Sequence, residues 1–261
     1  MGPSFEVLLE TAHSLANAAA LVTLTHFRSH PTAEHKGGGA FDPVTVADRG
    51  AESVMRDILA REFPQHGIAG EEFENVNEGA DFVWTLDPID GTRSFILGLP
   101  LWGTLIGLQH QGKPILGIMD QPFTGERFWS DEQAAWYRGP SGLVRCKTRP
   151  CARLDQAYLA ATTPDMFEGS DETGFNRLAK AARMRRFGGD CYLYCMLALG
   201  HIDIVAEAKL KPFDIVPLIP IVEKAGGVVT EWGGEDGSAN GRFIACGDPG
   251  LLESALSSLR A

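Results

Sequence analysis

Acidic residues at the ends of apolar segments are the feature of this sequence best suited to chemistry. Asp87 and Asp90 follow the apolar run 82–86, and Glu71 and Asp214 also stand where apolar segments end. Two carboxylates held close together repel one another unless a cation lies between them. Hard oxygen ligands of this kind suit Mg²⁺ or Ca²⁺ better than zinc. We therefore expect these acids to form a shared metal site.

The segment 86–92, Leu-Asp-Pro-Ile-Asp-Gly-Thr, also predicts a phosphate site. Pro88 disfavours the helical conformation at Asp87, so the strand should end extended there. Gly91 permits a tight turn. The backbone N–H groups of Gly91 and Thr92 then stand at a helix start, where they can hold phosphate oxygens. One short loop would supply metal ligands and a phosphate cradle together.

Each acidic segment taken alone has a simpler interpretation. Asp-Pro and Asp-Gly are common turn dipeptides. Asp48 can belong to a capping box, and Asp214 can be the N-cap of a helix. Glu71 with its neighbour Glu72 can be a solvated pair. The shared metal site becomes the better account because every one of these acids stands at the end of a predicted element.

The periodicity of apolar residues predicts an α/β (α+β) layered sandwich. An N-terminal part, 1–148, would hold most of the metal ligands, and a C-terminal part, 149–261, would hold Asp214 and the substrate-binding residues. The predicted helices cover 5–30, about 45–60, 92–97, 171–183, 191–199, 214–226 and 251–259. The predicted strands cover 82–86, 104–108, 115–119, 126–129, 134–137, 158–161, 202–206, 228–230 and 243–246.

Composition narrows the classes of partner. The 261-residue chain carries a formal net charge of −11, so nucleic acid and anionic membranes are poor partners, and a phosphorylated small molecule would need a metal at its site. Five cysteines, an odd number, indicate free thiols in a reducing cytosol. We expect no signal peptide, no apolar stretch long enough to span a bilayer, and a cytoplasmic location.

At these residues the chain resembles the inositol monophosphatase family of metal-dependent phosphatases. The first family signature is similar to 84–95, Trp-Thr-Leu-Asp-Pro-Ile-Asp-Gly-Thr-Arg-Ser-Phe, and the second to 211–227. Thr45-Val-Ala-Asp48 and Gly70-Glu-Glu72 match in order and spacing. The resemblance covers about residues 5–250. It implies an αβαβα sandwich of the inositol monophosphatase / fructose-1,6-bisphosphatase type, and a homodimer.

The resemblance also implies residue roles. One Mg²⁺ would be held by Glu71, Asp87 and the backbone carbonyl of Ile89, and a second by Asp87, Asp90 and Asp214. A third, weaker Mg²⁺ would lie near Glu71. Water would attack phosphorus in line, positioned by Thr92 and Asp48 with Glu71 nearby. Lys36, followed by three glycines, resembles a mobile loop that covers the metals.

One segment departs from the inositol-cleaving pattern. Members that cleave inositol phosphate usually carry a Gly-Ser/Thr-Ala-type stretch where this chain has 188–192, Gly-Gly-Asp-Cys-Tyr. This segment and 207–212 resemble the histidinol-phosphate phosphatases, which would make Asp190 and Glu207 substrate-binding residues. The simpler interpretations are a helix N-cap for Asp190 and a solvated strand-end charge for Glu207.

Four hypotheses therefore remain open: a histidinol-phosphate phosphatase of histidine biosynthesis, an inositol-1-monophosphatase, a 3′,5′-bisphosphate nucleotidase, and a non-catalytic phosphate- or metal-binding protein. A bisphosphate would need a cationic pocket, against which Asp190 and Glu207 argue. The non-catalytic hypothesis is disfavoured because no proposed ligand is missing. Arg183, Arg185 and Arg186 are interpreted as a solvated cluster at a helix end, with a dimer interface as the less favoured role.

Overall fold

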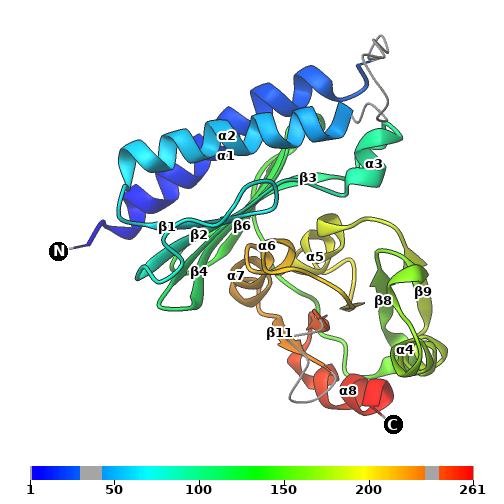
Figure 1. Cartoon of the computed structure of the whole chain (residues 1–261). Helices are drawn as coiled ribbons and strands as arrows, with labels where there is room; N and C mark the ends of the chain where they lie inside the picture. The colour runs from blue at the N-terminus through cyan, green and yellow to red at the C-terminus, as the bar shows by residue number, and fades with distance from the viewer. Residues whose placement is uncertain (1, 30–42, 233–240, 261) are drawn as a thin grey trace.

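The protein folds into five layers of alternating helices and sheets (Figure 1). The structure is a computed structural model that describes residues 2–29, 43–232 and 241–260. A helix pair covers one face of a seven-stranded sheet, and a central helical layer fills the space between this sheet and a second, five-stranded one. A last helix pair closes the other side. This arrangement confirms the predicted αβαβα sandwich.

The seven-stranded sheet runs in chain order, with β1 parallel to β2 and every later neighbour antiparallel. Its last strand was not predicted, because the side chains of β7 are all exposed and leave no alternating apolar pattern. The strands are β1 (Gly67–Gly70), β2 (Phe82–Asp90), β3 (Gly103–His110), β4 (Lys113–Gln121), β5 (Glu126–Ser130), β6 (Ala135–Gly139) and β7 (Gly142–Arg145).

Helices α1 (Phe5–His26) and α2 (Pro43–Glu62) cover the outer face of this sheet. The buried face of α1 is rich in alanine, with Ala12, Ala16 and Ala19 fully buried, so the helix lies close to its neighbours. With 22 residues, α1 is long and apolar enough to cross a membrane by length and composition. The expectation that no stretch would reach that length is therefore wrong, although α1 here packs on α2 and the sheet.

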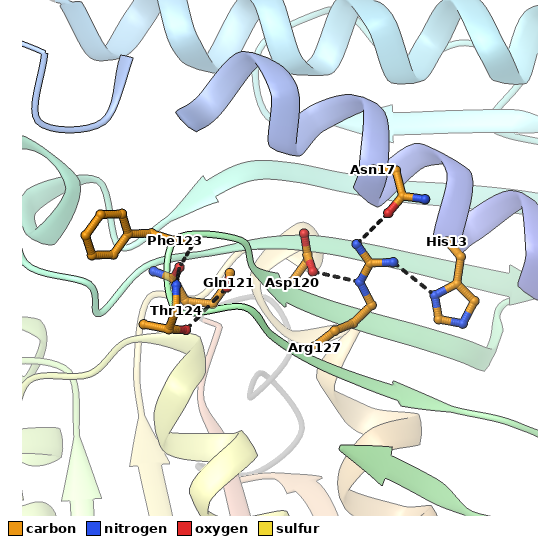
Figure 2. A network of polar contacts seen from close by, with 7 residues as sticks. All are labelled: His13, Asn17, Asp120, Gln121, Phe123, Thr124 and Arg127. Carbon is orange, nitrogen blue, oxygen red and sulfur yellow. Dashed lines mark hydrogen bonds and ion pairs between the residues drawn. The ribbon is translucent and has the colours of Figure 1, made fainter. Parts of the chain in front are cut away.

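A polar network fixes α1 to the sheet (Figure 2). The guanidinium of Arg127 on β5 donates to Oδ1 of Asp120 on β4 at 2.7 Å and to Oδ1 of Asn17 on α1 at 2.9 Å. Its third nitrogen lies 3.3 Å from Nδ1 of His13, also on α1. Asp120 is 4% exposed, so this pair is largely shielded from solvent and holds helix and sheet in one register.

The second sheet has the strand order β11-β12-β10-β8-β9. Strands β8, β9 and β10 run parallel, whereas β12 is antiparallel to both of its neighbours. The strands are β8 (Tyr158–Ala161), β9 (Met184–Phe187), β10 (Ile204–Glu207), β11 (Val228–Glu231) and β12 (Phe243–Cys246). The helices of this half are α4 (Ser170–Ala181), α5 (Cys191–Ala198), α6 (Pro212–Ile215), α7 (Leu218–Lys224) and α8 (Leu252–Arg260), with 3-10 turns at Leu154–Gln156, Pro164–Met166 and Pro249–Leu251.

Two predictions for this half are corrected. Arg185 and Arg186 lie on the edge strand β9, with Arg183 just before it, and not in a cluster at a helix end. An exposed edge strand carries little apolar pattern, which explains the error. Asp214 does not open a helix either. It is the third residue of α6, whose N-cap is Lys211.

A pair of glycines lets the central layer lie flat on the first sheet. Gly107 on β3 and Gly117 on β4 are cross-strand partners. A Cβ atom at Gly117 would overlap the carbonyl of Pro217, and one at Gly107 would meet the Pro217 backbone nitrogen at 3.1 Å. This close approach seats the segment from α6 to α7 on the sheet and brings Asp214 over β2. The five cysteines are free and buried, as predicted.

Candidate active site

The end of β2 carries the two acids of segment 86–92. The strand continues past the predicted range 82–86 to Asp90, but its register against β3 shifts between Asp87 and Asp90. This irregularity is a β-bulge, and the hydroxyl of Thr104 holds it by donating to the carbonyl of Pro88 at 2.8 Å. Oδ1 of Asp87 accepts from the N–H of Ile89 at 3.0 Å. Both carboxylates are thereby fixed at one edge of the sheet.

Three acids from distant parts of the chain meet at this edge. Oxygens of Asp87, Asp90 and Asp214 all lie within 4.8 Å of one another. The side chains of Glu71 and Asp214 both lie close enough to Asp87 for each pair to affect the other's pKa. Asp87 therefore occupies the centre of the cluster, between Glu71 on one side and Asp214 on the other.

A second acidic cluster adjoins the first. Oxygens of Asp48, Glu71 and Glu72 also lie within 4.8 Å of one another. Glu72 was not assigned a role from the sequence, where its position next to Glu71 was the only available signal. Since Glu71 contacts Asp87, the two clusters form one continuous acidic site.

The loop that carries Glu71 is braced by α2. Oε2 of the fully buried Glu52 accepts from the N–H of Glu72 at 2.8 Å. Oε1 of Glu52 pairs with Arg56 at 2.7 Å, and Arg56 in turn donates to the carbonyls of Phe73 and Glu74. A side chain at Gly70 would overlap Glu52. This brace was missed from the sequence, because Glu52 and Arg56 look like an ordinary i,i+4 helix pair.

Burial and like charge raise the pKa of every acid at the centre of the site. The pKa of Glu71 rises to about 7 and that of Asp214 to about 6, mainly through burial. Burial and the neighbouring carboxylates raise the pKa of Asp87 and of Asp90 well above the usual range. An all-oxygen donor set that repels itself in this way fits a hard divalent cation, which removes the repulsion.

The start of α5 supports Asp90 from the other half of the chain. The backbone N–H of Cys191 donates to Oδ2 of Asp90 at 2.6 Å. Asp190 is the N-cap residue, as the simpler interpretation expected, but its side chain makes no capping hydrogen bond. The carboxylate instead lies 3.4 Å from the hydroxyl of Ser94, and its Cγ would be 3.2 Å from a Cβ on Gly91.

The backbone of Asp190 is strained. Its φ of 47° and ψ of −135° fall in a region that glycine alone adopts readily. Gly188 and Gly189 before it also have positive φ. The chain thus turns sharply at this point, which places the Asp190 carboxylate beside Gly91 and not over the end of its own helix.

Glu207 is not a solvated strand-end charge. The side chain at the end of β10 is 2% exposed, and its two oxygens accept from the N–H of Thr162 at 2.8 Å and the hydroxyl of Tyr194 at 2.9 Å. Burial raises the pKa of Glu207 to about 7, and the nearby charge of Asp190 adds to the shift. A buried carboxylate with this environment, facing a pocket, is a candidate functional group.

One pocket joins two acids of the first cluster to these two residues. Asp90, Asp214, Asp190 and Glu207 together form its acidic lining. Among the residues that the structure describes, no Lys or Arg lines this pocket. The remaining lining is mostly apolar or aromatic and consists of Thr162, Met166, Cys191, Tyr194, Leu210 and Leu218. Thr162 and Tyr194 were not identified from the sequence.

The structure describes Thr92 and Asp48, the residues predicted to position water, and the turn at Gly91 beside them. Gly91 has the left-handed conformation that its turn requires, with φ 86°, and α3 (Thr92–Ile96) begins directly after it. The hydroxyl of Thr92 donates to the carbonyl of Ile89 at 3.2 Å. Asp48 is buried on α2 beside Glu71 and Glu72. Lys36 lies outside the described residues, so its assignment to a mobile loop stays a prediction.

Comparison with known proteins agrees with this geometry. The model of the inositol monophosphatase family matches residues 5–261. The chain belongs to the inositol monophosphatase family. Members of this family are metal-dependent phosphatases, so the protein is a phosphoric ester hydrolase, and the prediction of a metal-dependent phosphatase is confirmed.

Relatives within the family have different named activities. The chain is 40% identical to the chloroplastic bifunctional phosphatase IMPL2 of Arabidopsis thaliana, over 95% of this chain and 73% of the relative. It is 32% identical to a histidinol-phosphatase of Streptomyces coelicolor, over 91% of each chain. It is 30% identical to an inositol-1-monophosphatase of Caulobacter vibrioides, over 85% of this chain and 89% of the relative.

A solved structure of an inositol monophosphatase from Zymomonas mobilis superposes with a TM-score of 0.87. It is 41% identical and the match covers 99% of both chains. The fold is therefore that of the family over its whole length, whereas the named activities of the relatives leave the substrate open.

Proposed function

We propose that the protein is a Mg²⁺-dependent histidinol-phosphate phosphatase, which hydrolyses L-histidinol phosphate to L-histidinol and phosphate. The observation that carries this proposal is the pocket that Asp90 and Asp214 line together with the half-buried Asp190 and the buried Glu207. Asp90 and Asp214 suit a metal with a phosphate, and Glu207 and Asp190 suit a cationic group of the substrate.

The residues for binding Mg²⁺ are those of the two acidic clusters. Glu71, Asp87 and the Ile89 carbonyl would hold one ion, and Asp87, Asp90 and Asp214 a second. The central position of Asp87, in contact with Glu71 and Asp214, supports its role as the shared ligand. When bound, Mg²⁺ supplies charge neutralisation for the phosphate oxygens and for the leaving oxygen.

The side chains around the clusters would orient the reactants. Thr92 and Asp48 would position the water that attacks phosphorus in line, with Glu71 nearby. The hydroxyl of Thr92 already donates to the carbonyl of Ile89, so its proton is directed to that carbonyl and its lone pairs remain to accept from water. The N–H groups of Gly91 and Thr92 would bind phosphate oxygens.

The substrate tail distinguishes histidinol phosphate from inositol phosphate. Histidinol phosphate carries an ammonium group and an imidazole ring, whereas inositol phosphate presents neutral hydroxyls. Glu207 and Asp190 would bind the ammonium, and the apolar lining of Met166, Leu210 and Leu218 suits a ring better than a polyol. A charge-assisted hydrogen bond contributes about 1.5–3 kcal/mol, or roughly one to two decades of preference.

Steady-state kinetics with two substrates test the proposal. The purified protein with Mg²⁺ should have a kcat/KM for histidinol phosphate at least about tenfold above that for inositol-1-phosphate. Glu207→Gln should reduce the value for histidinol phosphate while leaving that for a neutral aryl phosphate nearly unchanged. Equal or faster cleavage of inositol-1-phosphate by the unmodified protein would instead establish an inositol-1-monophosphatase, the activity named for the Caulobacter vibrioides relative.

A further inference from the structure

Two residues of helix α5 and the residue before it line the pocket. Asp190 precedes the helix, Cys191 is its first residue and Tyr194 follows one turn later, and all three line the pocket. Residues three or four apart share one face of a helix. Tyr194 is the member of this group that neither the acidic clusters nor the phosphate site accounts for.

Tyr194 contacts the pocket's most deeply buried acid. Its side chain is 1% exposed, and its hydroxyl donates to Oε2 of Glu207 at 2.9 Å. The burial of the phenol and the nearby charge of Glu207 raise the pKa of Tyr194, so the hydroxyl keeps its proton and acts as a donor. A phenylalanine ring would fill the same space without this hydroxyl, so packing alone does not require the polar atom.

Other hydrogen bonds fix the second carboxylate oxygen and the backbone of Glu207. Oε1 accepts from the Thr162 N–H, and the backbone carbonyl accepts from the indole of Trp232 at 3.0 Å. Oε2 accepts from the Tyr194 hydroxyl, and the Thr162 side chain also interacts with the Glu207 carboxyl. Without the phenol, this oxygen can rotate and the carboxylate loses a donor that stabilises its charge.

We propose that Tyr194 is a positioning residue for specificity, which fixes the Glu207 carboxylate toward the cationic end of the substrate. This inference rests on the proposed function, because it takes an ammonium-bearing phosphate monoester as the ligand. Tyr194 acts through Glu207 and has no part in the attack on phosphorus. Removal of the Tyr194 hydroxyl should therefore weaken binding of a cationic substrate and leave kcat unaffected.

The same helix offers a matched control. Tyr192 is a half-buried phenol of α5 whose hydroxyl donates to Glu126 on β5, and it does not line the pocket. Tyr192→Phe removes one hydroxyl from the same helix, with the same loss of a carboxylate partner. A general loosening of α5 would affect the two variants alike, whereas a specific role would separate them.

The test compares Tyr194→Phe with Tyr192→Phe on histidinol phosphate and on a neutral aryl phosphate. Tyr194→Phe should raise KM for histidinol phosphate about tenfold, with kcat and the aryl phosphate constants within about twofold. Tyr192→Phe should change both substrates equally. In the double variant Tyr194→Phe/Glu207→Gln, the loss should equal that of Glu207→Gln alone, because two residues acting through one contact are not additive.

The outcomes separate this inference from the proposed function. If the unmodified protein prefers histidinol phosphate but Tyr194→Phe and Tyr192→Phe give the same ratio between substrates, Tyr194 has only a structural role. If the unmodified protein shows no preference, the proposed function fails, and an unchanged ratio in Tyr194→Phe overturns this inference with it. Independent, additive losses in the double variant would also overturn it, since Tyr194 would then not act through Glu207.

Discussion

The backbone N–H of Cys191 donates to Oδ2 of Asp90 across 101 positions of sequence, at 2.6 Å. This one bond connects the first turn of α5 to the bulged end of β2. It orients an acid of the first sheet by means of a helix from the second half of the chain. Asp214 reaches the same acid from α6, so both halves must be in place before the cluster exists.

The acidic cluster should cost stability when no metal is bound. Asp87 is central and its pKa is raised by burial and by its acidic neighbours, so Asp87→Asn should abolish phosphatase activity but raise the melting temperature in the presence of a chelator. Added Mg²⁺ should stabilise the unmodified protein and not the variant. Differential scanning fluorimetry with EDTA or Mg²⁺ measures both effects.

A lower melting temperature of Asp87→Asn in EDTA would mean that the carboxylate supports the fold and does not oppose it. Asp155→Asn is the matched control, because Asp155 is an exposed acid paired with Arg153 at the surface. It should leave both activity and the response to Mg²⁺ unchanged.

The buried Glu207 should make stability depend on pH. Its pKa is raised from 4.5 to about 7 in the folded protein, mainly by burial. The folded state therefore binds a proton that the unfolded state has already released, and stability is lost as pH rises from about 4.5 through 7. Glu207→Gln should be more stable than the unmodified protein at pH 8, and this gain should vanish near pH 4.

Urea unfolding in EDTA at several pH values measures the difference in unfolding free energy between Glu207→Gln and the unmodified protein. The other acids are common to both proteins, so this difference reports Glu207. A constant gap between the two proteins over pH 4–8 would show that folding does not raise the pKa of Glu207.

His13 should make the protein less stable as pH falls, whereas Glu207 should make it less stable as pH rises. Burial, and then the charges of Arg127 and Arg138, lower the pKa of His13 from 6.5 to about 4. The unfolded state therefore binds a proton first, so the contribution of neutral His13 is present above pH 6.5 and is lost as pH falls toward 4. His13→Gln keeps an acceptor for Arg127 and should reduce acid sensitivity in this range. The fluorescence of Trp129, whose ring contacts His13 at 5.1 Å, can report unfolding.

The strained backbone at Asp190 predicts a gain in stability from glycine. Asp190→Gly relieves a conformation with φ 47° and ψ −135°, which costs on the order of 1–3 kcal/mol in a residue with a side chain. Asp190→Asn removes the same charge but keeps the strain. Denaturant unfolding should therefore rank glycine above asparagine by about 1 kcal/mol. Equal stability of the two variants would show that charge alone sets the cost.

Local chemistry explains what the sequence predicted correctly. The segment from Asp87 to Thr92 forms its turn and its short helix through Pro88 and Gly91, whose conformational limits act within a few residues. The long helices and the meander follow from apolar periodicity. The five-layer order came from the family resemblance and is confirmed by the structure.

Contacts between distant segments explain what the sequence did not predict. The brace from Glu52 to the N–H of Glu72, and the phenol of Tyr194 on Glu207, join residues that are distant in the sequence. Glu52 and Tyr194 themselves look like ordinary helix residues in the sequence. Strand β9 was missed because an exposed edge strand shows no apolar alternation. Asp214 was placed at a helix start because Asp is a common N-cap residue, whereas it is the third residue of α6, and its side chain accepts from the backbone N–H of the N-cap Lys211.

The glycine pair Gly107 and Gly117 makes the distance between Asp87 and Asp214 depend on two positions that have no functional group. A single methyl at Gly117 would lift the α6–α7 segment at Pro217 and move one metal ligand away from the others, with no change in any charge. Loss of metal affinity would then arise from substitution in the middle of a sheet. The spacing of the acids at the end of β2 therefore rests on two residues whose only contribution is the absence of a side chain.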